Sequence, residues 1–382
     1  SAGRGRGVGR GGVRTGDCRH GRRGAVEADD VACGGLVLGE VTCEVGVGVG
    51  LHEDGAVAVA VPQAGVEGAE DVAADVLGGG DVGIAQLAQG PGHLGTGLAQ
   101  SEFFHPGWER GAHEEDGRKD PEFFQRVLED KYLNELAWDI NFESARLCRK
   151  WADEIGSKTG RKRYVAGAIG PMTVSLSQFP DPEDLSFRRI TFDQAVEAYR
   201  HQIRGLIAGG SDILMVETIF DSLNAKAALF AIDEFFEASG ERLPLIISGT
   251  VTDASGRILS GQTVTAFWHS VRHAKPLAIG LNCALGAALM RPYIQELAKV
   301  AGDTFISCYP NAGLPNPMSE TGFDETPDVT SRLLHEFAAE GLVNIVGGCC
   351  GTTPDHIGAI SRAVAPLAPR NVHSGFFYKE AA

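Results

Sequence analysis

Three cysteines in the second half of the chain have the residue type and flanking sequence of a metal site. Cys349 and Cys350 are adjacent, and Cys283 precedes them. Neighbouring residues of a regular strand point to opposite faces, so two adjacent sulfurs can approach one point only where the backbone turns. Glycines at positions 347, 348 and 351 flank the pair and permit such a turn. Three thiolates are the ligands expected around a catalytic zinc ion whose fourth position stays open.

The charge of such a site narrows the chemistry it can support. Three thiolates and a zinc dication leave one net negative charge, which makes the metal a weak Lewis acid for water but a good binding position for another sulfur. A substrate thiol bound there is held as thiolate, whereas a free thiol with a pKa of about 8.5 is only a few per cent ionised near pH 7. These residues therefore predict alkyl transfer to a thiol.

Other cysteines favour a structural interpretation, because buried cysteines commonly act as small apolar residues. The same interpretation stays open for the adjacent pair. Cys148 lies in a helical stretch and Cys308 in an apolar run, and both are predicted to be core residues. Cys18, Cys33 and Cys43 lie in a glycine-rich segment and support no site.

Six short apolar runs are predicted to be buried strands, each separated from the next by enough residues for a loop and a helix. Polar or sulfur-bearing residues lie at or just beyond their carboxyl ends: Glu217, Asn282 with Cys283, Asn311, and the Cys349–Cys350 pair. The runs are Tyr164–Ile169, Ile213–Val216, Leu245–Ser248, Leu277–Leu281, Thr304–Cys308 and Val343–Val346.

Helices are predicted between these strands. Apolar residues recur at helical spacing over 121–155, which predicts one long amphipathic helix ended by Gly156. Thr191 with Gln194 forms a capping box, Asp221 precedes a further helix, and Thr353–Pro354 starts another. Repeating βα units predict an α/β fold, either a doubly wound sheet or a (β/α)8 TIM-type barrel. The barrel is favoured because it brings all the strand ends to one axial site. Six strands are two fewer than the barrel needs, so the two remaining strands must come from residues 1–120 or be missing.

Composition restricts the class of protein. The chain has 382 residues, 43% of them apolar, and a net charge of −16, which argues against nonspecific binding to nucleic acid or to an anionic membrane. No apolar run is long enough to span a bilayer, and no signal-peptide pattern opens the sequence. Eight cysteines in so long a chain fit a reducing compartment. We therefore expect a cytoplasmic protein without a membrane partner.

The domain organisation is predicted to be uneven. Residues 1–120 are rich in glycine, alanine, valine and, near the start, arginine. Such a segment is expected to be a disordered arm, because glycine-rich chains do not repay their ordering entropy. An RGG-like nucleic-acid arm and a segment translated from a wrong reading frame are the alternatives. Residues 121–370 are expected to form the barrel, and 371–382 a tail.

Three motifs resemble the homocysteine-binding module of cobalamin-dependent methionine synthase: residues 280–286 (GLNCALG), 309–316 (YPNAGLPN) and 346–354 (VGGCCGTTP). Segments 216–221 (VETIFD), 247–250 (ISGT) and 260–263 (SGQT) are similar to further signatures, and the resemblance covers 133–370. It implies a barrel that carries zinc on Cys283, Cys349 and Cys350 and methylates homocysteine to methionine. It also implies that Glu217 holds the substrate's amino group. Asn282 and Ser248 are candidates for further polar contacts with the substrate, or for ties between loops.

The chain also departs from that family. The Asp-Gly-Gly-x-Gly-Thr and Glu-Thr-Asn-Thr-Phe motifs of the first two barrel strands do not occur in residues 1–132, and residues 170–173 read GPMT where the family has GPTN. The fold expected is thus a barrel without its first two standard strands. No segment after Arg370 resembles a folate or cobalamin module, so methylcobalamin would have to come from another module or chain. The alternatives are a stand-alone enzyme that uses betaine or S-methylmethionine, and an inactive fragment.

Overall fold

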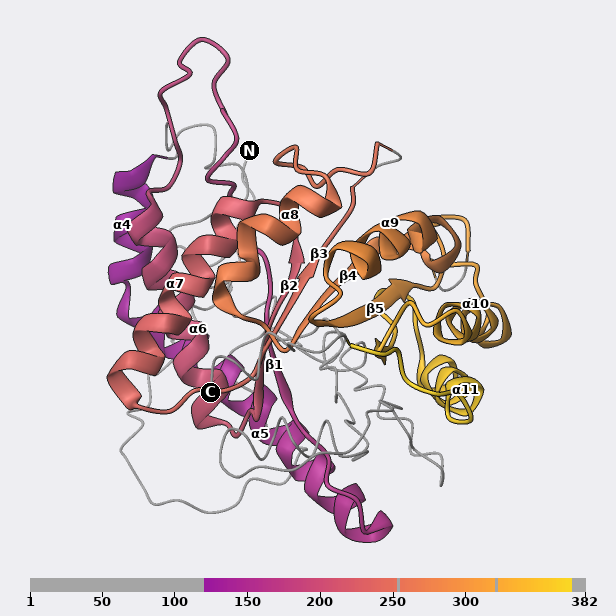
Figure 1. Cartoon of the computed structure of the whole chain (residues 1–382). Helices are drawn as coiled ribbons and strands as arrows, with labels where there is room; N and C mark the ends of the chain where they lie inside the picture. Colours follow the sequence, from indigo (N-terminus) through magenta and orange to yellow (C-terminus); the bar gives the residue numbers. More distant parts are fainter. Residues whose placement is uncertain (1–119, 253–254, 320–321, 373–382) are drawn as a thin grey trace, which may run out of the picture. The chain divides into compact units, whose positions relative to one another are not determined.

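The computed structural model describes residues 120–252, 255–319 and 322–372, and in them strands and helices alternate along the chain (Figure 1). Two helices come first, α4 (Pro121–Glu129) and α5 (Lys131–Thr159). The strands are β1 (Ala166–Ile169), β2 (Ile213–Ile219), β3 (Leu245–Gly249), β4 (Ala278–Gly286), β5 (Phe305–Asn311) and β6 (Ile345–Val346). The helices between and after them are α6 (Phe192–Ala208), α7 (Ser222–Ser239), α8 (Val264–Val271) with the short η2 (Arg272–Ala274), α9 (Ala287–Val300), α10 (Pro327–Ala339) and α11 (Pro354–Val364).

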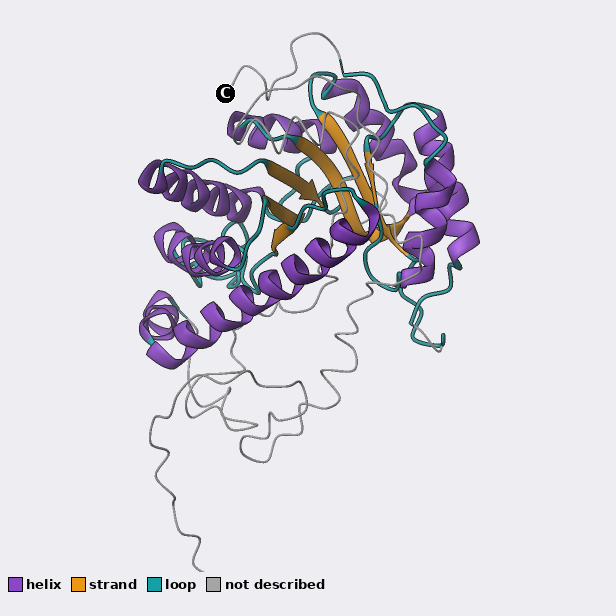
Figure 2. Cartoon of the chain, turned by 90° about the horizontal axis from the view of Figure 1, so that it is seen from below, coloured by secondary structure: helices purple, strands orange, loops and turns teal. Residues whose placement is uncertain are grey.

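The described strands form one parallel sheet whose spatial order follows the chain, β1-β2-β3-β4-β5-β6. Each strand therefore pairs with the next one along the sequence after a helical crossover. The helices form an outer layer around the strands (Figure 2). This is the architecture of an incomplete TIM-type barrel, and the predicted α/β class is confirmed. The two strands needed to complete eight were expected either to come from residues 1–120 or to be missing, and those residues, apart from Asp120, lie outside the described part of the chain.

The single helix predicted over 121–155 is wrong in two respects. Asp130 has extended backbone dihedrals, ends α4, and starts α5 by accepting a hydrogen bond from the Leu133 N–H at 3.0 Å. The aspartate thus offers the backbone a cap in place of a continuous helix. At the other end α5 runs past Gly156 and stops at Gly160, whose φ of 67° is left-handed. Gly156 remains helical, and a side chain there would meet the Arg161 carbonyl at 3.0 Å.

The other predicted helix starts are confirmed. Thr191 accepts a hydrogen bond from the Gln194 N–H, and the Gln194 side chain accepts one from the Thr191 N–H, which completes a capping box. Asp221 caps α7 by accepting a hydrogen bond from the Leu223 N–H at 2.8 Å. Pro354 is the first residue of α11. These caps fix where each helix starts after its strand and loop.

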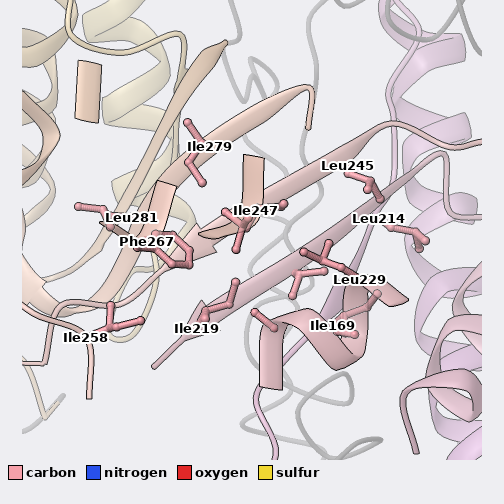
Figure 3. Packing of buried hydrophobic residues seen from close by; sticks show 14 of the residues in the cluster. Ile169, Leu214, Ile219, Leu229, Leu245, Ile247, Ile258, Phe267, Ile279 and Leu281 are labelled. Carbon is pink, nitrogen blue, oxygen red and sulfur yellow. The ribbon is translucent and has the colours of Figure 1, made fainter. Parts of the chain in front are cut away.

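The sheet separates two sets of buried apolar side chains. Residues facing the helices include Leu214, Ile247, Ile279 and Leu281, and they pack with helix residues such as Phe267 of α8 (Figure 3). Alternate residues of the same strands face the other way and form a second buried set, which includes Ile213, Met215, Ile246, Phe305 and Tyr309. This alternation follows from the two-residue period of a strand. Cys148 and Cys308 are buried in the core, as predicted.

Three strands extend well beyond the carboxyl ends of their apolar runs: β2 reaches Ile219, β4 reaches Gly286 and β5 reaches Asn311, while β3 is longer by Gly249 alone. The pairing register shifts between Val216 and Ile219 and again between Asn282 and Gly286. These irregularities let the strands continue through polar residues while the backbone changes direction. They place Thr218, Asn282 and Cys283 at the carboxyl ends of β2 and β4.

Within the described residues, none of the helices combines the length and hydrophobicity that crossing a membrane requires.

Candidate metal centre

The carboxyl end of β4 turns sharply at the first predicted ligand. Cys283 and Ala284 have φ values of 61° and 47°, in the left-handed region that residues with a Cβ seldom adopt. Each such residue costs on the order of 1 kcal/mol or more, which the surrounding structure must sustain. Asn282, still paired in register just before this turn, points inward and is fully buried, while Cys283 in the turn is partly exposed.

The adjacent cysteines lie in a turn directly after β6. The Cys349 N–H donates to the Pro310 carbonyl at 2.8 Å, and the Cys350 N–H donates to Asn311 Oδ1 at 3.0 Å. Gly351 is left-handed with a φ of 76°. The turn is thus attached to the end of β5 by its own backbone, and it brings both sulfurs toward the end of β4.

The three sulfurs converge. The Sγ atoms of Cys283, Cys349 and Cys350 all lie within 4.8 Å of one another, and those of Cys283 and Cys350 are 3.6 Å apart. In a tetrahedral zinc site with Zn–S bonds of about 2.3 Å, ligand sulfurs are separated by about 3.8 Å. Separation and donor type therefore fit a zinc ion held by three thiolates. The sequence placed these residues at strand ends, and the structure brings all of them together.

The sulfurs affect one another's ionisation. A hydrogen bond from Cys349 lowers the pKa of Cys283, but hydrogen bonding to Cys350 and burial outweigh it and raise that pKa to about 11. Hydrogen bonding with both other thiols, together with burial, raises the pKa of Cys349 well above its ordinary value. Three thiolates packed so closely repel one another, so a bound cation is the natural counterpart of their ionised form.

Glu217 lies on the inward face near the end of β2 and is only 2% exposed. Burial raises its pKa to about 7, the neighbouring Tyr309 hydroxyl opposes that rise, and the nearby Cys350 adds to it. Burial and Glu217 raise the pKa of Tyr309 well above its ordinary value, which keeps the phenol protonated as a donor. A buried carboxylate beside a neutral phenol is suited to a cationic group on a ligand.

Asn282 and Ser248 lie beside this carboxylate, and both are fully buried. The Ser248 hydroxyl donates to Asn282 Oδ1 at 2.7 Å. Asn282 also contacts Thr218, whose φ of 54° makes it another left-handed residue. The predicted polar residues thus occupy inward positions of neighbouring strands at the same end of the sheet.

Two members of the site, Tyr309 and Thr218, were not identified from the sequence. Tyr309 pairs directly with Asn282 across β4 and β5, so counting in twos along β5 from Phe305 would have placed it on the inward face. Thr218 carries no comparable signal, since a left-handed threonine beside a register shift depends on its tertiary neighbours.

The chain is similar to known proteins in sequence and in structure. The sequence profile of the family described as homocysteine S-methyltransferase matches residues 122–364. Among solved structures, the apo form of the homocysteine methyltransferase MmuM from Escherichia coli is 17% identical, with a TM-score of 0.45 over 71% of this chain and 83% of that one. Its metallated form is 18% identical, with a TM-score of 0.45 over 60% and 72%. The 3-hexulose-6-phosphate synthase from Salmonella typhimurium is 13% identical, with a TM-score of 0.30 over 59% and 80%.

Proposed function

The chain belongs to the homocysteine S-methyltransferase family, and on that premise we propose that it transfers a methyl group to the thiol of homocysteine, forming methionine, with zinc held by Cys283, Cys349 and Cys350. The observation that carries this proposal is the convergence of three sulfurs within 4.8 Å at the carboxyl ends of the strands. Parallel barrels place their active sites at this end.

The bound zinc would hold the substrate sulfur as a thiolate, which is a far better nucleophile than the thiol. The protein's own residues would supply the position of the substrate. Glu217 would accept hydrogen bonds from the ammonium group of homocysteine, and Tyr309 would hold the Glu217 carboxylate in place. An arriving ammonium lowers the pKa of a buried carboxylate, so binding would favour the ionised form of Glu217.

The methyl transfer balances without a redox partner from the protein. The thiol proton of homocysteine would be released to solvent when the sulfur binds as thiolate. A lone pair of that sulfur then forms the new S–C bond, and the bond between the methyl carbon and its donor breaks with both electrons leaving on the donor. The product is a neutral thioether, a much poorer zinc ligand than a thiolate, so methionine formation also favours product release.

For the donor we propose methylcobalamin supplied by another module or chain, as the homocysteine module of a methionine synthase would require. The close match of residues 280–286, 309–316 and 346–354 to that class of enzyme supports this choice. Betaine and S-methylmethionine are the competing donors. We propose the reducing cytoplasm as the compartment, because the proposed zinc site needs three reduced thiols.

The experiment is a donor comparison on the zinc-loaded full chain. Purified protein is analysed for zinc and then incubated with homocysteine and methylcobalamin, S-methylmethionine or betaine, with methionine measured by mass spectrometry. We expect one zinc per chain and methionine from methylcobalamin. If methionine forms with betaine or S-methylmethionine but not with methylcobalamin, that compound is the donor and the proposed donor is wrong. A zinc-loaded, monodisperse protein inactive with every donor would identify an inactive fragment.

A further inference from the structure

The buried side chain of Asn282 connects the cysteine cluster to the strand that carries Glu217. It lies at the end of β4, directly before Cys283, and is 0% exposed. Its Nδ2 group donates to Cys349 Sγ at 3.6 Å and to Thr218 Oγ1 at 2.8 Å. Its Oδ1 atom accepts from the Thr218 N–H at 3.1 Å and from the Ser248 hydroxyl at 2.7 Å.

The orientation of this amide is fixed by its neighbours. The backbone N–H of Thr218 can only donate, so the atom of Asn282 that faces it must be the carbonyl oxygen. The NH₂ group then has to face the sulfur of Cys349. An asparagine side chain has two donors and two acceptor positions, and all four are used by groups of the protein. No hydrogen-bonding capacity is left for a ligand.

We propose that Asn282 is a positioning residue of the metal centre, which holds the Cys349 sulfur through an N–H···S hydrogen bond, and that it does not contact the substrate. The proposal rests on the proposed zinc site. A hydrogen bond to a ligand thiolate disperses part of its negative charge and fixes its direction, which matters where three thiolates share one buried site. Because the same amide holds the left-handed Thr218, it also fixes Glu217, the preceding residue, relative to the sulfurs.

The first test is the isosteric variant Asn282→Asp in the full chain. Aspartate keeps an acceptor for the Thr218 N–H and the Ser248 hydroxyl, but it replaces the donor to Cys349 by an oxygen that bears negative charge. Loss of such an outer contact typically weakens metal binding about 10- to 100-fold. We expect that loss for zinc in competition with a chromophoric chelator, and a shift of the sulfur-to-metal charge-transfer band in the cobalt-substituted protein.

Asn344→Asp is the matched control. Asn344 is also buried, and it also bridges elements, by accepting from the Ile306 N–H at 3.0 Å and donating to the Arg370 carbonyl at 2.9 Å. It lies directly before β6, at the amino-terminal end of the strands, whereas the cysteines follow their carboxyl ends. We expect this variant to change the free energy of unfolding while zinc affinity stays within about twofold of the unsubstituted protein and the cobalt band does not move.

A measurement on the unsubstituted protein covers the case in which Asn282→Asp does not fold. With cadmium-113 in the site and nitrogen-15 in the asparagine side chains, a hydrogen bond to a ligand sulfur transmits a scalar coupling from the metal to the amide proton. We expect this coupling for the Asn282 amide and none for the Asn344 amide. Its absence from Asn282 would overturn the proposal.

The outcomes separate this inference from the proposed function. If the unsubstituted protein binds neither zinc nor cobalt, the zinc site itself is wrong. If it binds metal and Asn282→Asp matches it in metal affinity and cobalt spectrum, only the positioning role is wrong. A raised KM for homocysteine with unchanged metal properties would instead make Asn282 a substrate contact.

Discussion

The two faces of one sheet carry opposite kinds of residue. Facing the helices, β2 to β5 present an unbroken apolar layer that includes Leu214, Ile247 and Leu281. On the inward face the same strands begin with apolar residues but end in Glu217, Ser248, Asn282 and Tyr309. Strands with identical pairing partners thus carry a core on one side and a polar, sulfur-rich site at one end of the other.

The difference between the two faces shows that the site lowers the stability of the folded protein, whereas the apolar helix-facing side chains raise it. The outer layer has regular backbone and complementary packing, so burial of its side chains favours folding at about 25 cal/mol per Å² of apolar surface. The site combines three left-handed non-glycine residues, Thr218, Cys283 and Ala284, with a buried carboxyl group. Each of these features opposes folding. The helix-facing layer must therefore hold the site in its strained form.

The sharpest test of this comparison replaces one cysteine on each side of the sheet. In Cys349→Ala we expect zinc affinity to fall on the order of a thousandfold, because a ligand worth about 4 kcal/mol is lost. In Cys308→Ala, where the sulfur faces the helices, zinc should stay at one per chain while the free energy of unfolding falls by about 1 to 2 kcal/mol. Zinc analysis after gel filtration and urea unfolding measure both. Full zinc retention by Cys349→Ala would refute the site.

Truncation of Phe267 tests the outer layer alone. Its ring is fully buried and fills the space beside Gly249, where an added Cβ would lie 2.8 Å from it. We expect Phe267→Ala to lower the free energy of unfolding by about 3 to 5 kcal/mol and to leave the zinc content of the folded protein unchanged. Phe230, which is 50% exposed on α7, is the matched control, and Phe230→Ala should cost about 1 kcal/mol or less. Equal losses in the two variants would contradict the assignment of stability to the buried layer.

Glu217→Gln tests whether the site lowers stability. The folded-state pKa of Glu217, about 7, lies above the ordinary 4.5. Between these values the folded protein retains a proton that the unfolded chain releases, so the free energy of unfolding falls as pH rises from about 4.5 to about 7. The shift corresponds to about 3 kcal/mol. We expect the metal-free Gln variant to lack this fall and to be more stable than the unsubstituted protein at pH 8.

Urea unfolding of both metal-free proteins from pH 4.5 to 8 measures that effect, with Glu237→Gln as a control at an exposed glutamate of α7. The same Glu217→Gln substitution should weaken homocysteine binding by the zinc-loaded protein, which isothermal titration calorimetry can follow. Parallel pH profiles for the Glu217→Gln variant and the unsubstituted protein would show that burial of this acid does not cost stability.

The strands and the helices that cover them are also the part of the fold that the sequence predicted best. The strands of a parallel sheet covered by helices are continuous apolar runs, and such runs located all six described strands. The helix starts at Thr191, Asp221 and Thr353 were equally readable, because a cap depends on residues only two or three positions apart. The break at Asp130 was missed because the helical spacing of apolar residues continues across it.

The site was predictable in residue type but not in geometry. Adjacent cysteines between glycines, and a third cysteine at another strand end, were enough to nominate Cys283, Cys349 and Cys350. The hydrogen bonds of Asn282 to Thr218, Ser248 and Cys349 join residues from three strands and the turn after β6. Such contacts depend on strand register and on left-handed backbone, and neither leaves a periodic signal in the sequence.

The smallest effect is expected from two threonines at the N-termini of helices that cover the sheet. Thr191 and Thr326 occupy the same N-cap position of α6 and α10, but only the Thr191 side chain accepts the capping hydrogen bond. Thr191→Ala should therefore lower the free energy of unfolding by about 1 kcal/mol, whereas Thr326→Ala should cost only about 0.3 kcal/mol. Neither substitution reaches the cysteines, so zinc affinity should be unchanged in both. If removing this distant cap also weakened zinc binding, the helical layer would adjust the geometry of the site and not merely support it, and the division between the two faces would fail.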